Sequence, residues 1–573
     1  MRLLKLCCAA LLALASVLPT ASAQSLGKAT LARITFKGTS ILGASSASYN
    51  TITIQNNAPQ PDLVGARKNS VRSSTTTPTT LSVPMPRLDA ISTASPSVNF
   101  TGLTTVDTAI ANEGSVVTPP DQGLCSGHGY VMEAINSSLA VYKSSGARLT
   151  TPESVYTFFN LDPVANPILS DPRCYYDAPT QRWFASMINV LNFNTGRSNL
   201  VLAVSQTSDP TGAYNLYSID TTDDGLNGTP ADTGCSSSDP CFGDQPTLGA
   251  DANGIYITTN EFDLAGFYFN GAQVYAISKS GLESGSMPTV VHIGNLPLAE
   301  GPAYSIQPAS SPDLSSEGDS GVEYFLSALD FNGTLDNRIA VWALSNTGSL
   351  SEATPSVTLT NQILTSEVYG QPYPVTQKPG PYPLGQSLGE PEESIDSGDD
   401  RMQNAVYASG RLWAGLNTIV SDGSNINTGI AYFVVNPSMK GGQLSATLQG
   451  QGYIAVAGNS AIYPGIGVTA DGSAAAAFTV AGPGMYASAA YAHINPSHAG
   501  SVQIVAPGQA PQDDFSGYPE FHGSGVARWG DYSWGVADGS SLWFATEFIP
   551  GNIDSTNYYT DFGTQVFKVN LDQ

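Results

Sequence analysis

Positive charge is scarce in this chain. Of its 573 residues, 22 are Lys or Arg and 47 are Asp or Glu, which gives a formal net charge of −25. A surface with so much negative charge repels phosphate backbones and anionic lipid headgroups. We therefore expect no nucleic-acid partner.

Long apolar runs are also lacking, apart from one at the N-terminus. There Arg2 and Lys5 precede an apolar run from Leu6 to Leu18, which ends in the small residues "ASA". This is the plan of a secretory signal peptide, so we expect residues 1–23 to be removed after Ala23 and the protein to be secreted to the periplasm or the exterior. No later stretch approaches the roughly 20 apolar residues of a membrane helix, so no membrane insertion is expected.

Cysteine is sparse, with four residues after the expected cleavage site: Cys125, Cys174, Cys235 and Cys241. An even number in an exported protein indicates two disulfides, although four cysteines allow three pairings. The segment "CSSSDPC" closes a short polar loop. This favours Cys235 with Cys241 and, by elimination, Cys125 with Cys174.

Motifs that specify a reaction or a cofactor are absent. The chain contains no G-x-S-x-G, H-E-x-x-H or P-loop, and His292, His493, His498 and His522 show no metal-binding spacing. We predict no metal site and no cofactor. The loop "DTTDDGLNGTPADTG" (residues 220–234) is acidic enough to suggest Ca²⁺, but it lacks the final carboxylate of an EF-hand, so a solvated loop is the expectation.

Residues that favour strands and tight turns are plentiful, among them 57 Gly and 26 Tyr. No long stretch shows an apolar period of 3.6 residues. The composition therefore predicts an all-β fold.

One hairpin pattern recurs along the chain. It joins a leading Asp, a short strand, a turn and an aromatic strand, as in "ARWGDYSWGVADGSSLWFATEF" (527–548), "GDQPTLGADANGIYITTNEF" (243–262), "SDPRCYYDAPTQRWFASMI" (170–188) and "DDRMQNAVYASGRLWAGLNT" (399–418). The offset from Asp to aromatic residue is 12 for Asp171–Trp183, Asp244–Tyr256 and Asp531–Trp543, and 13 for Asp400–Trp413. "YPGIGVTADGSAAAAFTV" (463–480) follows the same plan, and weaker copies begin near Asp121 and Gln307.

These seven starts lie about 68 residues apart on average, which leaves room for four short strands in each unit. A ring of such units is a β-propeller, so we predict a seven-bladed β-propeller over residues 119–573. Residues 24–118 are read as an N-terminal extended arm with a Ser/Thr/Pro-rich linker, and this arm could supply the strand that closes the ring. A two-sheet sandwich is the main alternative, but it does not predict the shared offset.

Several segments also resemble a group of exported bacterial β-propeller proteins: "FTGLTTVD", "PPDQG", "GYVMEAINSSLAVY", "LAVSQTSDPTGAYNLYSID", "GIYITTNEF", "DSGDDRMQNAVYASGRLWAGLNT", "RWGDYS" and "LWFATEF". The resemblance covers about Phe100 to Val569. It implies a seven-bladed propeller outside the cytoplasm, and it implies no particular reaction, since a fold does not dictate a function.

The repeated hairpins place charged residues at equivalent levels. The leading aspartates are Asp171, Asp244, Asp400 and Asp531, and an Arg lies within three residues of three of them: Arg173, Arg401 and Arg528. In the simpler interpretation each Asp accepts backbone N–H groups and each Arg forms a local ion pair. In the alternative, the arginines converge on a carboxylate or uronate ligand while the aspartates bind a cation or act as acid and base. His128, between glycines in "SGHGY", is a further candidate ligand or base.

Two classes of function remain. One is a binding module that recognises carbohydrate or an extracellular protein, which we expect to be a monomer. The other is a carbohydrate-active enzyme, a glycoside hydrolase or lyase that is sialidase-like by analogy only and uses the Asp and Arg residues at the channel mouth. Tyr532, Glu261 and Glu547 are further groups that such an enzyme could use.

Overall fold

The computed structural model describes residues 29–43, 55–56, 81–161, 168–190, 197–226, 228–232, 234–312, 321–329, 333–551 and 561–571. The expected signal peptide lies outside them. The described residues form an all-β protein with a few short helices: α2 (Thr105–Ala111), α3 (Val155–Phe158), α4 (Lys279–Glu283) and α5 (Pro383–Leu388). None of the helices in this part of the chain has the length and hydrophobicity needed to span a bilayer.

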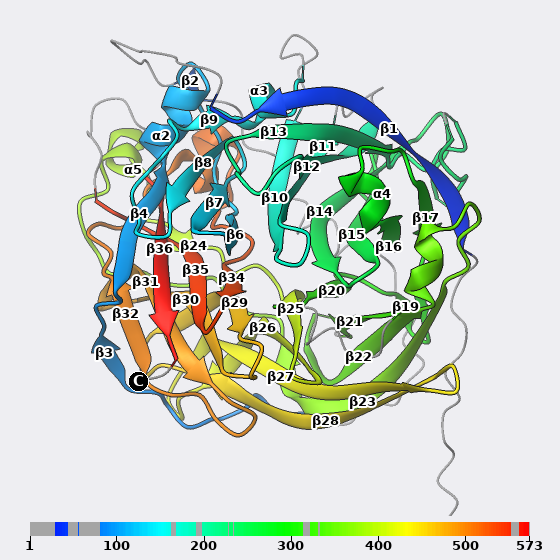
Figure 1. Cartoon of the computed structure of the whole chain (residues 1–573). Helices are drawn as coiled ribbons and strands as arrows, with labels where there is room; N and C mark the ends of the chain where they lie inside the picture. The colour runs from blue at the N-terminus through cyan, green and yellow to red at the C-terminus, as the bar shows by residue number, and fades with distance from the viewer. Residues whose placement is uncertain are drawn as a thin grey trace, which may run out of the picture.

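Most of the strands belong to meanders of four antiparallel strands, numbered here in chain order (Figure 1). Meander 1 is β6 (Gly123–Gly127), β7 (Tyr130–Ala134), β8 (Ser138–Lys143) and β9 (Glu153–Ser154). Meander 2 is β10 (Ile168–Asp177), β11 (Arg182–Val190), β12 (Ser198–Ser205) and β13 (Ala213–Asp220). Meander 3 is β14 (Cys241–Ala250), β15 (Gly254–Asp263), β16 (Phe269–Ser278) and β17 (Thr289–Ile293). Meander 4 is β20 (Gln307–Ser310), β21 (Val322–Ala328), β22 (Leu335–Ser345) and β23 (Thr358–Gly370).

Meanders 5 to 7 continue the pattern. Meander 5 is β25 (Met402–Ala408), β26 (Arg411–Ser421), β27 (Ile426–Lys440) and β28 (Gln443–Ile454). Meander 6 is β29 (Ser460–Val468), β30 (Ala474–Gly482), β31 (Met485–Ile494) and β32 (Val502–Ala506). Meander 7 is β34 (Trp534–Asp538), β35 (Ser541–Phe548), β36 (Gly563–Asn570) and β4 (Val98–Thr104).

The first strands of the meanders surround a common centre (Figure 1). Each contacts the first strand of the next meander, from β6 through β10, β14, β20, β25 and β29 to β34, and β34 contacts β6 in turn. The later strands of each meander lie toward the rim. This arrangement places every strand start that carries a candidate site residue near the centre.

The four aromatic residues of the repeated hairpin occupy corresponding positions. Trp183, Tyr256, Trp413 and Trp543 each lie near the beginning of the second strand of a meander, on β11, β15, β26 and β35, and each is at most 1% exposed. Their partners on the first strands are Tyr176, Gly249, Val406 and Val536. The shared offset from the leading Asp therefore reports a shared strand register, as expected.

The N-terminal arm contributes strands to several meanders. β4 pairs with β36 and completes meander 7, so the strand expected from the arm is present. β1 (Thr30–Ile41) pairs with β13 through one half and β17 through the other, and so joins the outer edges of meanders 2 and 3. β3 (Ile91–Thr93) pairs with β32. The described part of the Ser/Thr/Pro-rich segment, which we expected to be a linker, is bound along meanders 5 and 6, for example where the Asp89 N–H donates to the Ala455 carbonyl at 2.7 Å.

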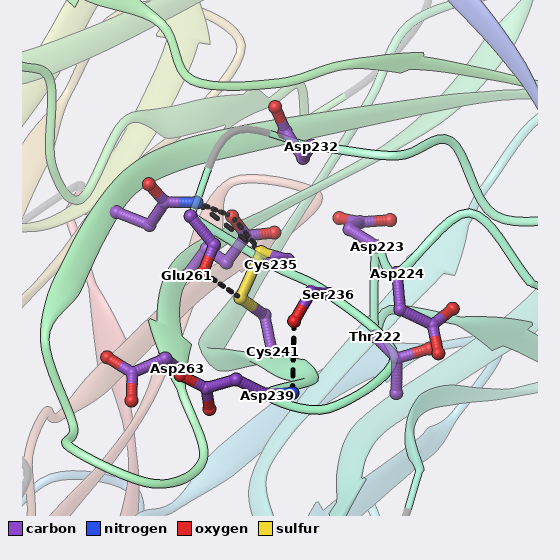
Figure 2. The surroundings of a disulfide bond; sticks show 12 residues. Thr222, Asp223, Asp224, Asp232, Cys235, Ser236, Asp239, Cys241, Glu261 and Asp263 are labelled. Atoms are coloured by element: carbon purple, nitrogen blue, oxygen red, sulfur yellow. Dashed lines mark hydrogen bonds between the residues drawn. A yellow bond between two sulfur atoms is a disulfide. The ribbon is translucent and has the colours of Figure 1, made fainter.

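Both disulfides of the favoured pairing are present. Cys125 of β6 is bonded to Cys174 of β10, with their Cα atoms 5.3 Å apart, so this disulfide ties meander 1 to meander 2. Cys235 is bonded to Cys241 and closes the loop that leads into β14 (Figure 2).

Candidate functional site at the ring centre

Four aspartates lie at the starts of first strands and form what we call the central carboxylate cluster: Asp121, Asp171, Asp244 and Asp531. Asp121 and Asp171 have left-handed backbones, with φ of 46° and 58°, a conformation that Asp tolerates better than most residues. The pairing of β10 with β11 shifts between Ser170 and Arg173, so a bulge falls at Asp171. Such bulges change the direction of a side chain at the end of a strand.

Two members of the cluster join neighbouring meanders by hydrogen bonds. The Asp531 N–H donates to Asp121 Oδ1 at 2.6 Å, and the Gln245 N–H donates to Asp171 Oδ2 at 3.2 Å. The Asp171 N–H donates in turn to Asn136 Oδ1 at 2.8 Å. The simpler interpretation, in which each Asp accepts backbone N–H groups, therefore describes Asp121 and Asp171, and the donors come from the adjacent meander.

The carboxylates of the cluster are close enough to affect one another's ionisation. Oxygens of Asp121, Asp171 and Asp531 lie within 4.8 Å of one another. Burial raises the pKa of Asp121 to about 6 and the pKa values of Asp171, Asp244 and Asp531 to about 7, and neighbouring carboxylates add to each shift. Near neutral pH the cluster therefore holds both protonated and ionised carboxyl groups.

Two of the predicted arginines reach this cluster. Arg401, just before β25 of meander 5, donates to both oxygens of Asp399, at 2.8 and 3.0 Å. It also donates to the side chain of Gln245 in meander 3, although meanders 3 and 5 are not adjacent in the ring. Arg528 lies 4.0 Å from Asp531, with 20% of its side chain exposed. The charges of both arginines partly offset the effect of burial on the pKa of Asp244.

The third predicted arginine, Arg173, is part of the interior. It is 1% exposed, and its guanidinium lies 3.3 Å from the ring centre of Tyr532. Its Nε–H donates to the Pro246 carbonyl at 2.7 Å. Arg173 thus packs between meanders 2, 3 and 7, and the three arginines do not form one exposed anion site.

Two other predicted residues lie apart from the cluster. Asp400 is fully buried. Burial raises the pKa of Tyr369, a residue at the end of β23, and the charge of Asp400 adds to this shift. His128 is exposed in the turn after β6, at the opposite end of that strand from Asp121. There it lines a cavity of about 220 Å³ whose other lining residues include Tyr175, Tyr176, Trp534 and Asp538.

Sequence reasoning left several residues out of the candidate site. The sequence identifies Asp121 only as the start of a weak copy of the hairpin repeat. Its position, equivalent to that of the leading aspartates, is the feature that would have placed it in the cluster. Asn136, Gln245 and Asp399 also bind the cluster or its arginines. Gln245 carries no local signal, because its partner Asp171 lies on another meander, whereas Asp399 and Asn136 bind Arg401 and Asp121 of their own meanders.

The chain has few informative relatives. No protein-family model matches it, and no curated protein matches it. Solved structures that match include an exo-β-1,3-galactanase from Clostridium thermocellum, at 10% identity and a TM-score of 0.29, covering 69% of this chain and 80% of that chain. A GH43 endo-arabinanase from Bacillus licheniformis matches at 16% identity and a TM-score of 0.22, covering 55% and 93%. The catalytic domain of a Coprinopsis cinerea GH62 α-L-arabinofuranosidase matches at 11% identity and a TM-score of 0.26, covering 61% and 97%. At these values the likenesses carry no argument about the present chain.

Proposed function

We propose that the protein is a secreted seven-bladed β-propeller that binds a neutral carbohydrate where Asp244, Asp531 and Arg528 meet at the ring centre. The contacts that run around the first strands support the propeller, because each meander then corresponds to one blade. The two disulfides support a location outside the cytoplasm.

One observation carries the choice of site. Asp244 and Asp531 keep partly exposed side chains within a cluster whose other two carboxylates are buried and hydrogen-bonded to backbone. Carboxylate oxygens accept strong hydrogen bonds from sugar hydroxyls, and Arg528 adds donors beside them. The site can therefore hold a ligand whose hydroxyl groups both donate and accept hydrogen bonds.

The charge balance favours a neutral ligand over an acidic one. The cluster has four carboxyl groups and two nearby arginines, and Arg401 is already paired with Asp399. An additional carboxylate or uronate would be repelled by the ionised members of the cluster. This argues against the anionic sugar that the three arginines suggested.

Hydrolysis of the bound sugar is a second candidate, favoured by the raised pKa values of the cluster. A glycoside hydrolase needs one protonated and one ionised carboxyl group at its working pH. Asp244 and Asp531, with pKa values of about 7, meet that requirement. Tyr532 does not suit the role of nucleophile, since it is buried and its hydroxyl donates to the Pro172 carbonyl at 3.0 Å.

The test is binding of the purified protein to arrays of neutral and uronate-containing polysaccharides, together with D244N and D531N. We expect binding to neutral glycans that weakens at least tenfold in either variant, about 1.4 kcal/mol. D538N is the matched control, because it removes the same charge at the opposite end of β34 from Asp531. Released reducing sugar would identify the enzyme. Unchanged binding in D244N and D531N would refute the site, and a loss in D538N alone would move it to the cavity beside His128.

A further inference from the structure

A second group of carboxylates lies beside the Cys235–Cys241 disulfide, outside the central cluster (Figure 2). Asp223 and Asp232 belong to the loop between β13 and β14, ahead of the short segment that the Cys235–Cys241 disulfide closes. Glu261 lies on β15, opposite Gly243 of β14. The group is therefore one strand farther from the ring centre than Asp244.

Two of its three acidic side chains, Asp223 and Glu261, are buried with few of the hydrogen-bond donors that burial normally requires. Asp223 and Glu261 are both fully buried, so the loop at Asp223 is not solvated as the sequence suggested. Among the described residues, no N–H or hydroxyl group donates to either oxygen of Asp223 or to Glu261 Oε2, and the two carboxyl groups lie within hydrogen-bonding reach of each other. Glu261 Oε1 accepts from Asn270 Nδ2 and lies 3.2 Å from the disulfide-bonded sulfur of Cys235, which has no hydrogen to donate.

Among the described residues, no Lys or Arg compensates these charges. Arg197, the nearest candidate in sequence, pairs with Asp220 at 2.7 Å and Asp224 at 3.1 Å. Within the described part of the chain, no ion pair joins a Lys or Arg to Asp223 or Glu261. Burial, and then the charges of Asp232, Asp220 and Asp224, raise the pKa of Asp223 to about 7. A buried carboxylate in this setting calls for a cation or a proton.

The geometry favours an ion that prefers oxygen. Ligand atoms of Asp223, Asp232 and His292 lie within 4.8 Å of one another, which is the size of a metal site. His292 Nε2 is 3.0 Å from the amide oxygen of Gln273. A nitrogen that donates to this oxygen carries the proton and cannot bind a metal, so the ligands that remain are oxygens.

We propose that Asp223 and Asp232, whose ligand atoms lie within 4.8 Å of each other, bind a Ca²⁺ ion together with Glu261, which lies against Asp223, and that the ion fixes the loop between β13 and β14 to β15. The ion supplies the positive charge that the described Lys and Arg residues do not provide there, and two oxygens of Asp223 and one of Glu261 accept from no N–H or hydroxyl group of the described residues. Because His292 also lies against Asp223 and pairs with Thr30 of β1, the ion stabilises the edge of meander 3 to which the N-terminal arm is attached.

The experiment measures thermal unfolding of the disulfide-bonded protein at pH 8, in EDTA and then with CaCl₂, MgCl₂ or ZnCl₂. We expect Ca²⁺ to bind in the sub-millimolar to millimolar range typical of extracellular sites and to raise the melting temperature by about 3 °C at 100-fold excess over Kd. A larger rise with Zn²⁺ would overturn the oxygen-only ligand set. No rise with any of the three ions would show that Asp223 and Glu261 share a proton instead.

Two isosteric variants make the test specific. D223N and E261Q each remove one buried charge, so in EDTA at pH 8 they should melt at or above the temperature of the unchanged protein. In Ca²⁺ they should melt below it, with Kd raised at least tenfold. D239N, in the neighbouring segment between the two disulfide cysteines, is the control and should respond to Ca²⁺ as the unchanged protein does. If all three variants gave the same change in melting temperature with Ca²⁺, the site would be refuted. Glycan binding through Asp244 and Asp531 is measured separately in each variant.

Discussion

At the scale of single residues, Arg173 shows how one side chain can hold three meanders together. Its guanidinium lies 3.3 Å from the ring centre of Tyr532, in the segment before β34, and 4.8 Å from the ring centre of Trp534. Its Nε–H reaches the Pro246 carbonyl of β14. A planar cation can stack and donate at once, which an ammonium group cannot do.

Arg173→Lys should therefore destabilise the protein although the charge is kept. We expect a loss of about 2 kcal/mol, since a desolvated stacking interaction and a charged hydrogen bond are both weakened. Urea unfolding measures the change. Arg33→Lys, at an exposed residue of β1, is the control and should stay within about 0.5 kcal/mol. Equal stability of the two variants would contradict the structural role given to Arg173.

The residue scale also shows where sequence reasoning stops. The repeat identified Asp171, Asp244 and Asp531 as equivalent, and they do meet at the ring centre. It could not distinguish Arg173 from Arg401 and Arg528, because stacking on Tyr532 depends on a residue more than 350 positions away. The repeat also could not show that Asp223 and Glu261 lie together, because Asp223 is in a loop and does not follow the spacing of the repeated hairpins.

At the scale of elements, β1 acts as a shared outer strand. One of its halves pairs with β13 and the other with β17, both antiparallel, so the arm covers two edges that would otherwise be open. Ile34 is 3% exposed and packs in a cluster that contains Tyr217, Ile219 and Val290. The repeat predicted the hairpins of the meanders, but β1 lies outside the repeat and its position follows only from the two edges that it covers.

Ile34→Ala should loosen both of these edges. Removing a buried side chain of this size costs about 2–4 kcal/mol, and the lost packing lies between β1 and the two strands it joins. Hydrogen exchange should become faster in β13 and β17 and stay unchanged in β32. Leu31→Ala, at a side chain that is 52% exposed, should change neither stability nor exchange. Faster exchange in β32 as well would mean that the arm supports the whole ring rather than two meanders.

At the scale of the whole molecule, two separate groups of buried acids lie on a chain with a net charge of −25. In the central cluster, the positive charges of Arg401 and Arg528 offset part of the negative charge. In the group beside the disulfide, no described Lys or Arg forms an ion pair with Asp223 or Glu261. Both groups raise the free energy of the folded state when they ionise. The stability of the protein should therefore depend on pH in the opposite sense to that of a protein held by ordinary salt bridges.

The sign of this dependence follows from the raised pKa values. An unfolded Asp ionises near pH 4, whereas Asp171, Asp244 and Asp531 ionise near pH 7 in the folded protein, so between these values the folded state binds more protons. The stabilisation that these three carboxyl groups contribute is therefore fully present below about pH 4. It is lost as pH rises through about 7.

Thermal unfolding from pH 5 to pH 8, in EDTA throughout so that no metal ion contributes, should show a falling melting temperature. Asp531→Asn removes one titrating carboxyl group and the repulsion that it exerts on Asp171 and Asp244, so its melting temperature should fall less steeply over the same range. Asp538→Asn, at the opposite end of β34 and with no place in the cluster, should follow the unchanged protein. A melting temperature that rises from pH 5 to pH 8 would mean that the cluster is held ionised by compensation from Arg401 and Arg528, and the protonated carboxyl group required for acid catalysis would then be lacking.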